Sequence, residues 1–313
     1  MAVSQKQAAL IGVPLGFGAG KIGSELGVNA MRSSPVRGKH ITDHIRDLGF
    51  NLEDRGDIAV DRPNRIAEES ENPKYLPEMV AAFATISASV KDILDGGKLP
   101  IILGGDHSIA IATFSGISSH FRSRSEECGL IWFDAHADIN TPETSQSGNI
   151  HGMPLAALLG EGHPDLVTMG GFSPKLDPKY FAHVGGRDFD AGESKRIRDL
   201  GLRDHFFTMS DIDKRGMLAC VEEAISIASK ASGGFAVTFD VDMIDPRFAP
   251  GSGTLVRGGA TYREAHLALE VIAEHGGMRS FEIVEVNPLL DQSNITVELA
   301  CELILSALGK TIL

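Results

Sequence analysis

The chain has 313 residues, of which 42% are hydrophobic and 23% charged, as in a globular protein that can bury a sizeable core. Its formal net charge of −13 argues against a nucleic-acid partner or an anionic membrane surface, because both require a basic surface. Three scattered cysteines, an N-terminus without a long apolar segment after a basic start, and the lack of any bilayer-length apolar run predict a cytoplasmic protein.

The first predicted strand, at 8–14, is followed by the glycine motif GAGKIG at 18–23, which has the spacing of a dinucleotide-binding loop. A dinucleotide-binding loop normally follows its strand at once, whereas here the stretch Pro14-Leu15-Gly16-Phe17 intervenes before Gly18. The acidic residue expected about 20 positions later would fall in 38–43, a stretch that looks helical. A triphosphate loop fails as well, because Leu15 stands where its first glycine belongs and Ile22 where Ser or Thr must follow the lysine. The motif is therefore predicted to be a flexible turn without a nucleotide.

Further apolar runs predict strands along the rest of the chain. Continuous apolar runs of this length are typical of parallel strands that are buried on both faces. Helix-like segments at 75–97 and 217–234 lie between them, and such alternation favours a three-layer α/β fold. One domain over residues 1–313 is the simplest account, although the loop at 140–153 is long. The predicted strands are 50–58, 99–105, 129–136, 181–188, 234–242 and 280–288.

Acidic residues and histidines follow these strands at the points where the apolar runs end. In an open parallel sheet, ligands bind at the carboxyl ends of the strands. Four of the predicted strands deliver such residues, namely Asp106 and His107, then Asp134, His136 and Asp138, then Asp240 and Asp242, and finally Glu285.

The spacing of these residues predicts a metal site. Asp134, His136 and Asp138 occupy alternate positions, so an extended strand would direct all three side chains to one face, and Asp240 and Asp242 repeat the pattern. Four converging carboxylates repel one another unless cations lie between them. Oxygen and nitrogen donors without thiolate favour two Mn(II) ions, with Fe, Co, Ni and Zn as alternatives. A single D-x-H or D-x-D would more often be a turn or a cap, but here the pattern recurs at three strand ends.

Three segments resemble the ureohydrolase superfamily, and most closely its arginase members: GGDHS at 104–108, DAHADINTPETSQSGNIHGMP at 134–154 and FDVDMIDPRFAPGSGT at 239–254. The resemblance covers nearly the whole chain. It implies an eight-stranded, mostly parallel sheet between helical layers, and a glycine loop at 18–23 near the mouth of the metal cleft. It also implies a binuclear manganese cluster held by His107, Asp134, His136, Asp138, Asp240 and Asp242.

The resemblance also implies a reaction, the hydrolysis of L-arginine to L-ornithine and urea by a hydroxide that bridges the two metal ions. Asp138 would orient the nucleophile and relay its proton, and Glu285 would pair with the guanidinium group, for which a carboxylate is the natural partner. His151 would transfer a proton to the leaving amine or to solvent, as the pKa of an imidazole allows.

Residues beyond the guanidinium site would select arginine over other guanidines. By resemblance, Asn140, Ser147 and Asn149 would bind the α-carboxylate, Asp190 the α-ammonium group with Glu193 nearby, and Thr254 would lie close to the site. Without the resemblance, this run of Asn, Ser and Gly would be read as a flexible surface loop. The alternatives are an agmatinase, a guanidino-acid hydrolase or a metal-binding homologue without activity, although no ligand of the pattern is missing. Family members form homo-trimers or homo-hexamers, and the sequence itself does not choose between them.

Overall fold

Eight parallel strands form one sheet in the order β2-β1-β3-β8-β7-β4-β5-β6. This confirms the expected eight-stranded sheet, and every pairing in it is parallel. The sequence predicted the first five strands and the last two, including the mostly polar edge strand β2, whereas β6 has only two residues and is too short for its pattern to be recognised. The strands are β1 (Lys6–Gly12), β2 (Phe50–Asp57), β3 (Leu99–Leu103), β4 (Gly129–Phe133), β5 (Phe181–Val184), β6 (Phe206–Phe207), β7 (Phe235–Asp240) and β8 (Met278–Val284).

This computed structural model describes residues 6–312. Residues 1–5 and residue 313 lie outside the described part. Residues 1–5 begin the N-terminal segment for which the sequence predicts no signal peptide. Among the described residues, no helix combines the length and the apolar character needed to cross a membrane. The three cysteines are buried and unpaired, as their spacing predicted.

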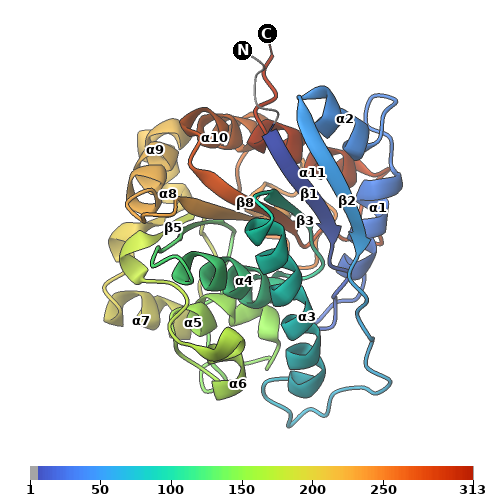
Figure 1. Ribbon diagram of the computed structural model, residues 1–313. Helices are drawn as coiled ribbons and strands as arrows, with labels where there is room; N and C mark the ends of the chain where they lie inside the picture. The colour runs from blue at the N-terminus through green and yellow to red at the C-terminus, as the bar shows by residue number, and fades with distance from the viewer. Residues whose placement is uncertain (1–5, 313) are drawn as a thin grey trace.

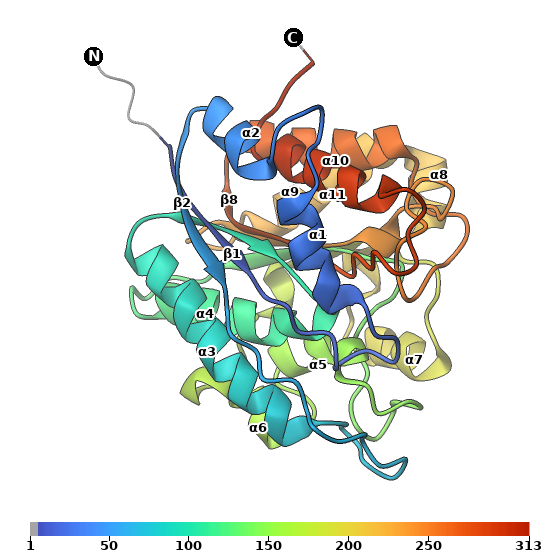
Figure 2. The same ribbon diagram turned by 90° about the vertical axis from the view of Figure 1, so that its right-hand side faces the viewer.

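Helices cover both faces of the sheet, so the predicted three-layer architecture is confirmed (Figures 1 and 2). The layer drawn above the sheet contains α1 (Gly27–Ser33), α2 (Ile41–Asp47), α8 (Met209–Arg215), α9 (Met217–Ala228), α10 (Tyr262–His275) and α11 (Ile295–Ala307). The layer below it contains α3 (Leu76–Asp95), α4 (Ala110–Arg122), α5 (Pro154–Leu158), α6 (Pro164–Val167) and α7 (Ala191–Asp199).

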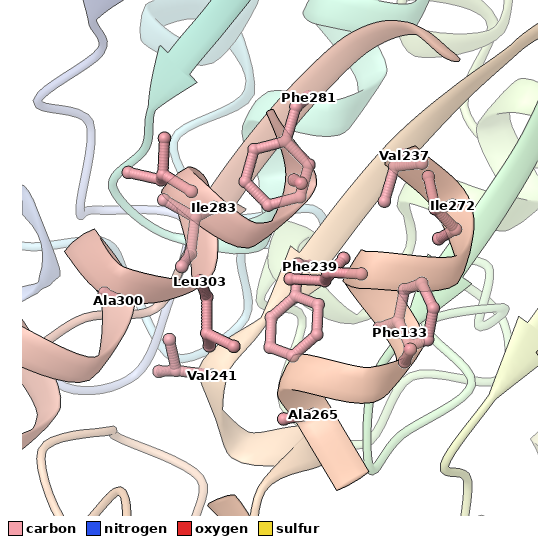
Figure 3. Close-up of a cluster of buried hydrophobic side chains, with 14 of the residues drawn as sticks. Phe133, Val237, Phe239, Val241, Ala265, Ile272, Phe281, Ile283, Ala300 and Leu303 are labelled. Carbon is pink, nitrogen blue, oxygen red and sulfur yellow. The ribbon is translucent and has the colours of Figure 1, made fainter. Parts of the chain in front are cut away.

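The central strands carry the apolar core that fixes the position of the strand ends. Phe133 of β4, Phe239 of β7 and Phe281 of β8 are fully buried against α10 and α11 (Figure 3). Burial of each such side chain contributes about 1.5–3 kcal/mol. The strands are buried along almost their whole length, as expected for parallel strands between two helical layers. The candidate site therefore lies at the ends of fully buried strands.

Candidate metal centre

Four adjacent central strands, β3, β8, β7 and β4, end beside one another and deliver the polar residues that the sequence singled out. His107 begins a short 3-10 helix, η2 (His107–Ile109), after β3, and Glu285 directly follows β8. Asp240 is the last residue of β7, and Asp134 directly follows β4. The predicted convergence of these strand ends is therefore present in the fold.

The local backbone differs from the extended course that the alternating pattern suggested. Strand β4 ends at Phe133, and Asp242 lies in a 3-10 helix, η7 (Val241–Met243). The carboxylates themselves bend the chain, because Asp134 Oδ1 accepts a hydrogen bond of 2.7 Å from the amide of His136, and Asp240 Oδ1 accepts one of 2.7 Å from the amide of Asp242. The expectation of an extended 134–138 segment was wrong, but these turns still direct the side chains to one point.

The inner group of the cluster surrounds the imidazole of His107. Its Nδ1 atom lies 2.9 Å from Asp134 Oδ2, 3.2 Å from Asp138 Oδ2 and 3.3 Å from Asp240 Oδ2. The His107 side chain is only 1% exposed. Three carboxylates and one imidazole thus face a common, solvent-shielded point.

The outer group surrounds His136, whose side chain is 24% exposed. His136 Nδ1 lies 3.0 Å from Asp242 Oδ2 and 3.4 Å from Asp134 Oδ1. Asp134 therefore presents one oxygen to each histidine and joins the two groups. The geometry supports two neighbouring cation positions, formed by His107, Asp134 and Asp138 and by Asp134, His136 and Asp242.

The electrostatics of this cluster fit divalent cations. Within residues 6–312, the buried Nδ1 atom of His107 has no hydrogen bond of good geometry, although it faces three carboxylates, and a metal ion between these groups would give the nitrogen and the carboxylate oxygens a common partner. Without a metal ion, burial lowers the pKa of His107, but the three carboxylates outweigh burial and raise the pKa well above its ordinary value. Burial, together with the neighbouring charge of Asp134, raises the pKa of Asp138 to about 6. Burial and the charges of Asp242 and Asp134 raise the pKa of Asp240 well above its ordinary value. These buried carboxylates repel one another when they are ionised, so their ionised form is stable only when positive charge lies between them.

Glu285 and His151 form a pair beside the inner group. Glu285 Oε1 accepts a hydrogen bond of 2.9 Å from the amide of His107 and lies 3.3 Å from His151 Nδ1. Burial alone would lower the pKa of His151, but the hydrogen bond to Glu285 and its negative charge outweigh burial and raise the pKa to about 9. Asp138 and Glu285 have left-handed backbone angles, φ 50° and 63°, which for residues other than glycine store strain of a kind found at functional sites.

A cavity of about 240 Å³ connects the metal ligands with the predicted recognition residues. Asn140 Nδ2 donates a hydrogen bond of 2.9 Å to Asp190 Oδ2, and Asp190 and Glu193 form a capping box at the start of α7. Ser147 and Asn149 are not among the residues that line the cavity. The lining residues are His136, Asp138, Asn140, His151, Gly152, Asp188, Asp190, Glu193, Asp240 and Thr254.

Glu193 is the most perturbed carboxyl group at the recognition end. It is 5% exposed, and burial, followed by the charge of Asp138, raises its pKa to about 8. Thr254 connects the cavity wall to the outer group, because its hydroxyl donates a hydrogen bond of 2.7 Å to Asp242 Oδ2.

The glycine motif at 18–23 forms a turn, as predicted, and it packs against the site. The amide of Gly18 donates a hydrogen bond of 2.7 Å to Asp106 Oδ2, and the Gly18 carbonyl accepts one of 3.1 Å from the amide of His151. A Cβ atom at Gly18 would lie 2.5 Å from Ser108 Oγ, so this close approach requires glycine. Lys21 lines a wider hollow of about 560 Å³ that shares His136, Asp188 and Thr254 with the cavity.

The sequence interpretation missed several residues that hold the ligands in place. The indole of Trp132 donates a hydrogen bond of 3.0 Å to Asp134 Oδ2, and its ring stacks on that of His107 at a centroid distance of 4.3 Å. His183 Nε2 lies 2.6 Å from the carbonyl oxygen of His136, and Arg187 donates hydrogen bonds to the carbonyls of Asp242 and Met243. Trp132 and His183 lie inside apolar runs, so the sequence pattern alone predicted them to be core residues. Asp188 also lines the cavity, and the sequence interpretation assigned no role to it.

Comparisons with known proteins agree over nearly the full chain. A model described as the arginase family matches residues 6–309. The chain is 44% identical over 308 residues to an arginase from Brevibacillus brevis, which covers 98% of this chain and 99% of that protein. It is 42% identical over 309 residues to an arginase from Bacillus caldovelox, covering 98% of this chain and 100% of that protein. The crystal structure of arginase from Bacillus subtilis superimposes with a TM-score of 0.90 at 41% identity, covering 98% of this chain and 100% of that one.

Proposed function

The chain belongs to the arginase family and is a hydrolase of that family, and from this premise we propose that it cleaves the guanidinium group of L-arginine to give L-ornithine and urea. We further propose that two Mn(II) ions bind between His107, Asp134, His136, Asp138, Asp240 and Asp242. When bound, a pair of divalent cations supplies a water of lowered pKa as nucleophile.

The cavity of about 240 Å³ carries this proposal, because its lining joins Asp138, a ligand of the cluster, to Asn140 and Asp190, the predicted α-group contacts. A guanidino amino acid can therefore place its guanidinium group beside the cluster and its α-groups at the other end. Agmatine, which has neither α-group, would leave the second end unused.

At the reacting end, Glu285 would accept hydrogen bonds from the guanidinium group and so fix the plane of the carbon that is attacked. The Glu285 carboxylate is prepared for this, since the amide of His107 already holds it in place at 2.9 Å. Asp138, whose carboxylate lines the same cavity, would orient the nucleophile and accept its proton.

His151 would donate a proton to the leaving amine. Its raised pKa of about 9 means that it carries a proton at neutral pH, and its Nδ1 atom lies 3.3 Å from Glu285. At the recognition end, Asp190 and Glu193 would bind the α-ammonium group, Asn140, Ser147 and Asn149 would bind the α-carboxylate, and Thr254 would hold Asp242 in place.

The whole chain would act as one catalytic domain, which the single sheet and the family match over residues 6–309 support. We also propose that the protein works in the cytoplasm and that it assembles as a homo-trimer or homo-hexamer. Cell fractionation and light scattering of the purified protein test them.

The deciding experiment measures urea released from L-arginine, agmatine and 4-guanidinobutyrate after incubation with Mn(II), together with the metal content of the protein. We expect urea from arginine and about two manganese ions per chain. Urea from agmatine but not from arginine would refute the substrate assignment. No urea from any of the three, with metal bound, would leave a metal-binding homologue without activity.

A further inference from the structure

A long loop, residues 58–75, connects β2 to α3 and extends to the lower end of the molecule as drawn in Figures 1 and 2. Connections between a strand and the next helix in α/β folds usually have about 2–6 residues, and long loops without secondary structure commonly have a function. None of the proposed site residues lies in this β2–α3 loop. Its length therefore calls for an explanation other than the connection of two elements.

The β2–α3 loop contacts the recognition loop, residues 139–153, at two points. Asn72 Nδ2 donates a hydrogen bond of 2.6 Å to the carbonyl oxygen of Pro142. The amide of Lys74 donates one of 2.9 Å to the carbonyl oxygen of Gly148. One loop thus holds the backbone of the other at two places.

Gly148 shows how closely the two loops approach each other. It is buried, and a Cβ atom there would lie 2.9 Å from the carbonyl oxygen of Glu71 and 3.4 Å from Asn72 Oδ1. Its φ of 69° also favours glycine. The neighbours of Gly148 in the chain are Ser147 and Asn149, which are proposed to bind the α-carboxylate. The backbone that carries them is therefore packed against the β2–α3 loop.

A network centred on Arg65 holds the end of the β2–α3 loop in place. Arg65 Nη1 and Nη2 donate hydrogen bonds of 2.6 and 2.8 Å to the two carboxylate oxygens of Glu71, and Arg65 Nε donates one of 2.7 Å to Glu78 Oε1 in α3. Glu71 Oε1 also accepts a hydrogen bond of 2.7 Å from the amide of Tyr75, and the guanidinium group lies 5.1 Å from the centroid of the Tyr75 ring. Such bidentate pairing fixes geometry better than a single ion pair at the surface does.

These contacts bear on substrate recognition through the loop that they hold. Asn72 and Lys74 are not among the residues that line the cavity, so they would act through the recognition loop and not on the substrate itself. Residues 145–149 read Ser-Gln-Ser-Gly-Asn, a composition that is flexible on its own. Bonds from outside reduce the conformational freedom that such a segment loses when a ligand binds, and so they increase affinity.

We propose that Asn72 and Arg65 are positioning residues for substrate recognition, with which the β2–α3 loop fixes the recognition loop in the shape that binds the α-groups of the substrate. The inference deepens the proposed function and rests on it for the identity of the substrate, but the contact between the two loops can be measured without substrate.

Steady-state kinetics with L-arginine give the first readout. Asn72→Ala removes the donor to Pro142, and Asn72→Asp replaces it by an acceptor of the same shape. Because a hydrogen bond that holds the recognition loop is lost, KM should rise about 2–10-fold with little change in kcat or in manganese content. The inhibition constant of L-ornithine, which carries the same α-groups, should rise by the same factor. Arg65→Ala, which releases Glu71 and Glu78, should act in the same direction.

Asn64→Ala and Asn64→Asp are the matched controls. Asn64 is exposed in the same loop and precedes Arg65 in the chain, and Asn64→Asp adds the same charge as Asn72→Asp. Both controls should keep the wild-type KM, kcat and manganese content. A merely structural role of the β2–α3 loop would lower kcat or the yield of folded protein and would not raise KM alone.

Hydrogen exchange of the substrate-free protein gives the second readout. The amides of Ser145 and Gly148 are hydrogen-bonded within the recognition loop, to the Thr141 carbonyl and the Ser145 hydroxyl. When the β2–α3 loop no longer holds this segment, these amides should exchange about 2–10-fold faster, as should the amide of Lys74. In Asn64→Ala they should exchange as in the wild type.

Unchanged exchange in Asn72→Ala and Arg65→Ala would overturn the inference, and so would faster exchange with an unchanged KM. An equal rise of KM in Asn64→Ala would overturn it as well. A wild-type protein that releases no urea from arginine would refute the proposed function, whereas faster exchange in the variants would still support the contact between the two loops.

Discussion

The two ends of the cavity are built differently. The proposed metal ligands, His107, Asp134, His136, Asp138, Asp240 and Asp242, lie where three strands of the sheet end, β3, β4 and β7. The recognition loops, residues 139–153 and 185–193, are mostly irregular and are held by local bonds, such as the capping box of Asp190 and Glu193. The sheet therefore fixes the reacting end, whereas short side-chain contacts fix the recognition end. Changes at the first end should impair the chemistry, together with metal binding where a proposed ligand is removed, and changes at the second should alter substrate affinity alone.

The largest effect is expected at the carboxylate shared by both groups of the cluster. Asp134→Ala removes the oxygens that lie 2.9 Å from His107 Nδ1 and 3.4 Å from His136 Nδ1. We expect loss of both metal ions and a fall in kcat/KM on the order of 10³-fold or more. Metal analysis and urea release measure the two effects.

Asp245→Ala is the matched control for this substitution. Asp245 is also buried and also accepts backbone hydrogen bonds, from the amides of Arg247 and Gly258, but it lies outside the cluster. It should lose stability and keep its metal. Two manganese ions per chain in Asp134→Ala would contradict the shared position of this carboxylate.

Glu285→Gln should separate chemistry from metal binding at the same end. Glutamine keeps the volume and an acceptor for the amide of His107, but it loses the charge that would pair with the guanidinium group. Because hydrogen bonds to charged groups contribute about 1.5–3 kcal/mol, kcat/KM should fall by up to about 100-fold. Manganese content should stay at the wild-type value, and a parallel loss of metal and activity would assign Glu285 to the cluster instead.

The same contrast explains what the sequence could predict. Parallel strands that are buried on both faces give long apolar runs, so seven of the eight strands and the polar residues at their ends were recognisable. The bend at 134–138 was not, because it depends on the hydrogen bond from the amide of His136 to Asp134, which competes with an extended course. Trp132 and His183 were missed for a related reason. They lie inside the apolar strands β4 and β5, where the sequence pattern alone assigns a residue to the core.

At the recognition end, Asp190→Asn should raise KM for arginine about tenfold with little change in kcat. Asparagine is as good an N-cap as aspartate, so α7 should keep its start and only the charge facing the α-ammonium group is lost. Steady-state kinetics on arginine and manganese analysis are the measurements. A loss of metal equal to the loss of activity would show that the two ends are not independent.

The last effect concerns stability and not activity, and it depends on pH. In the metal-free protein, burial and then the charge of Asp138 raise the pKa of Glu193 from 4.5 to about 8. The folded state therefore binds this proton more tightly than the unfolded state does. Its contribution to stability is complete below pH 4.5 and is lost as pH rises toward and through 8, by roughly 5 kcal/mol at most. Glu193→Gln should abolish this part of the pH dependence while keeping the bond from the amide of Asp190.

Chemical unfolding of the two metal-free proteins at pH 5 and pH 9 tests this expectation. Their free energies of unfolding should be similar at pH 5, and Glu193→Gln should be the more stable protein at pH 9. Glu264→Gln is the matched control, because Glu264 holds the same capping-box position at the start of α10 and lies outside the cavity. An equal pH dependence in wild type and Glu193→Gln would mean that Glu193 is no more costly to ionise than a surface carboxylate. The recognition end would then ionise a carboxyl group as easily as solvent does, unlike the buried cluster, where ionisation is costly.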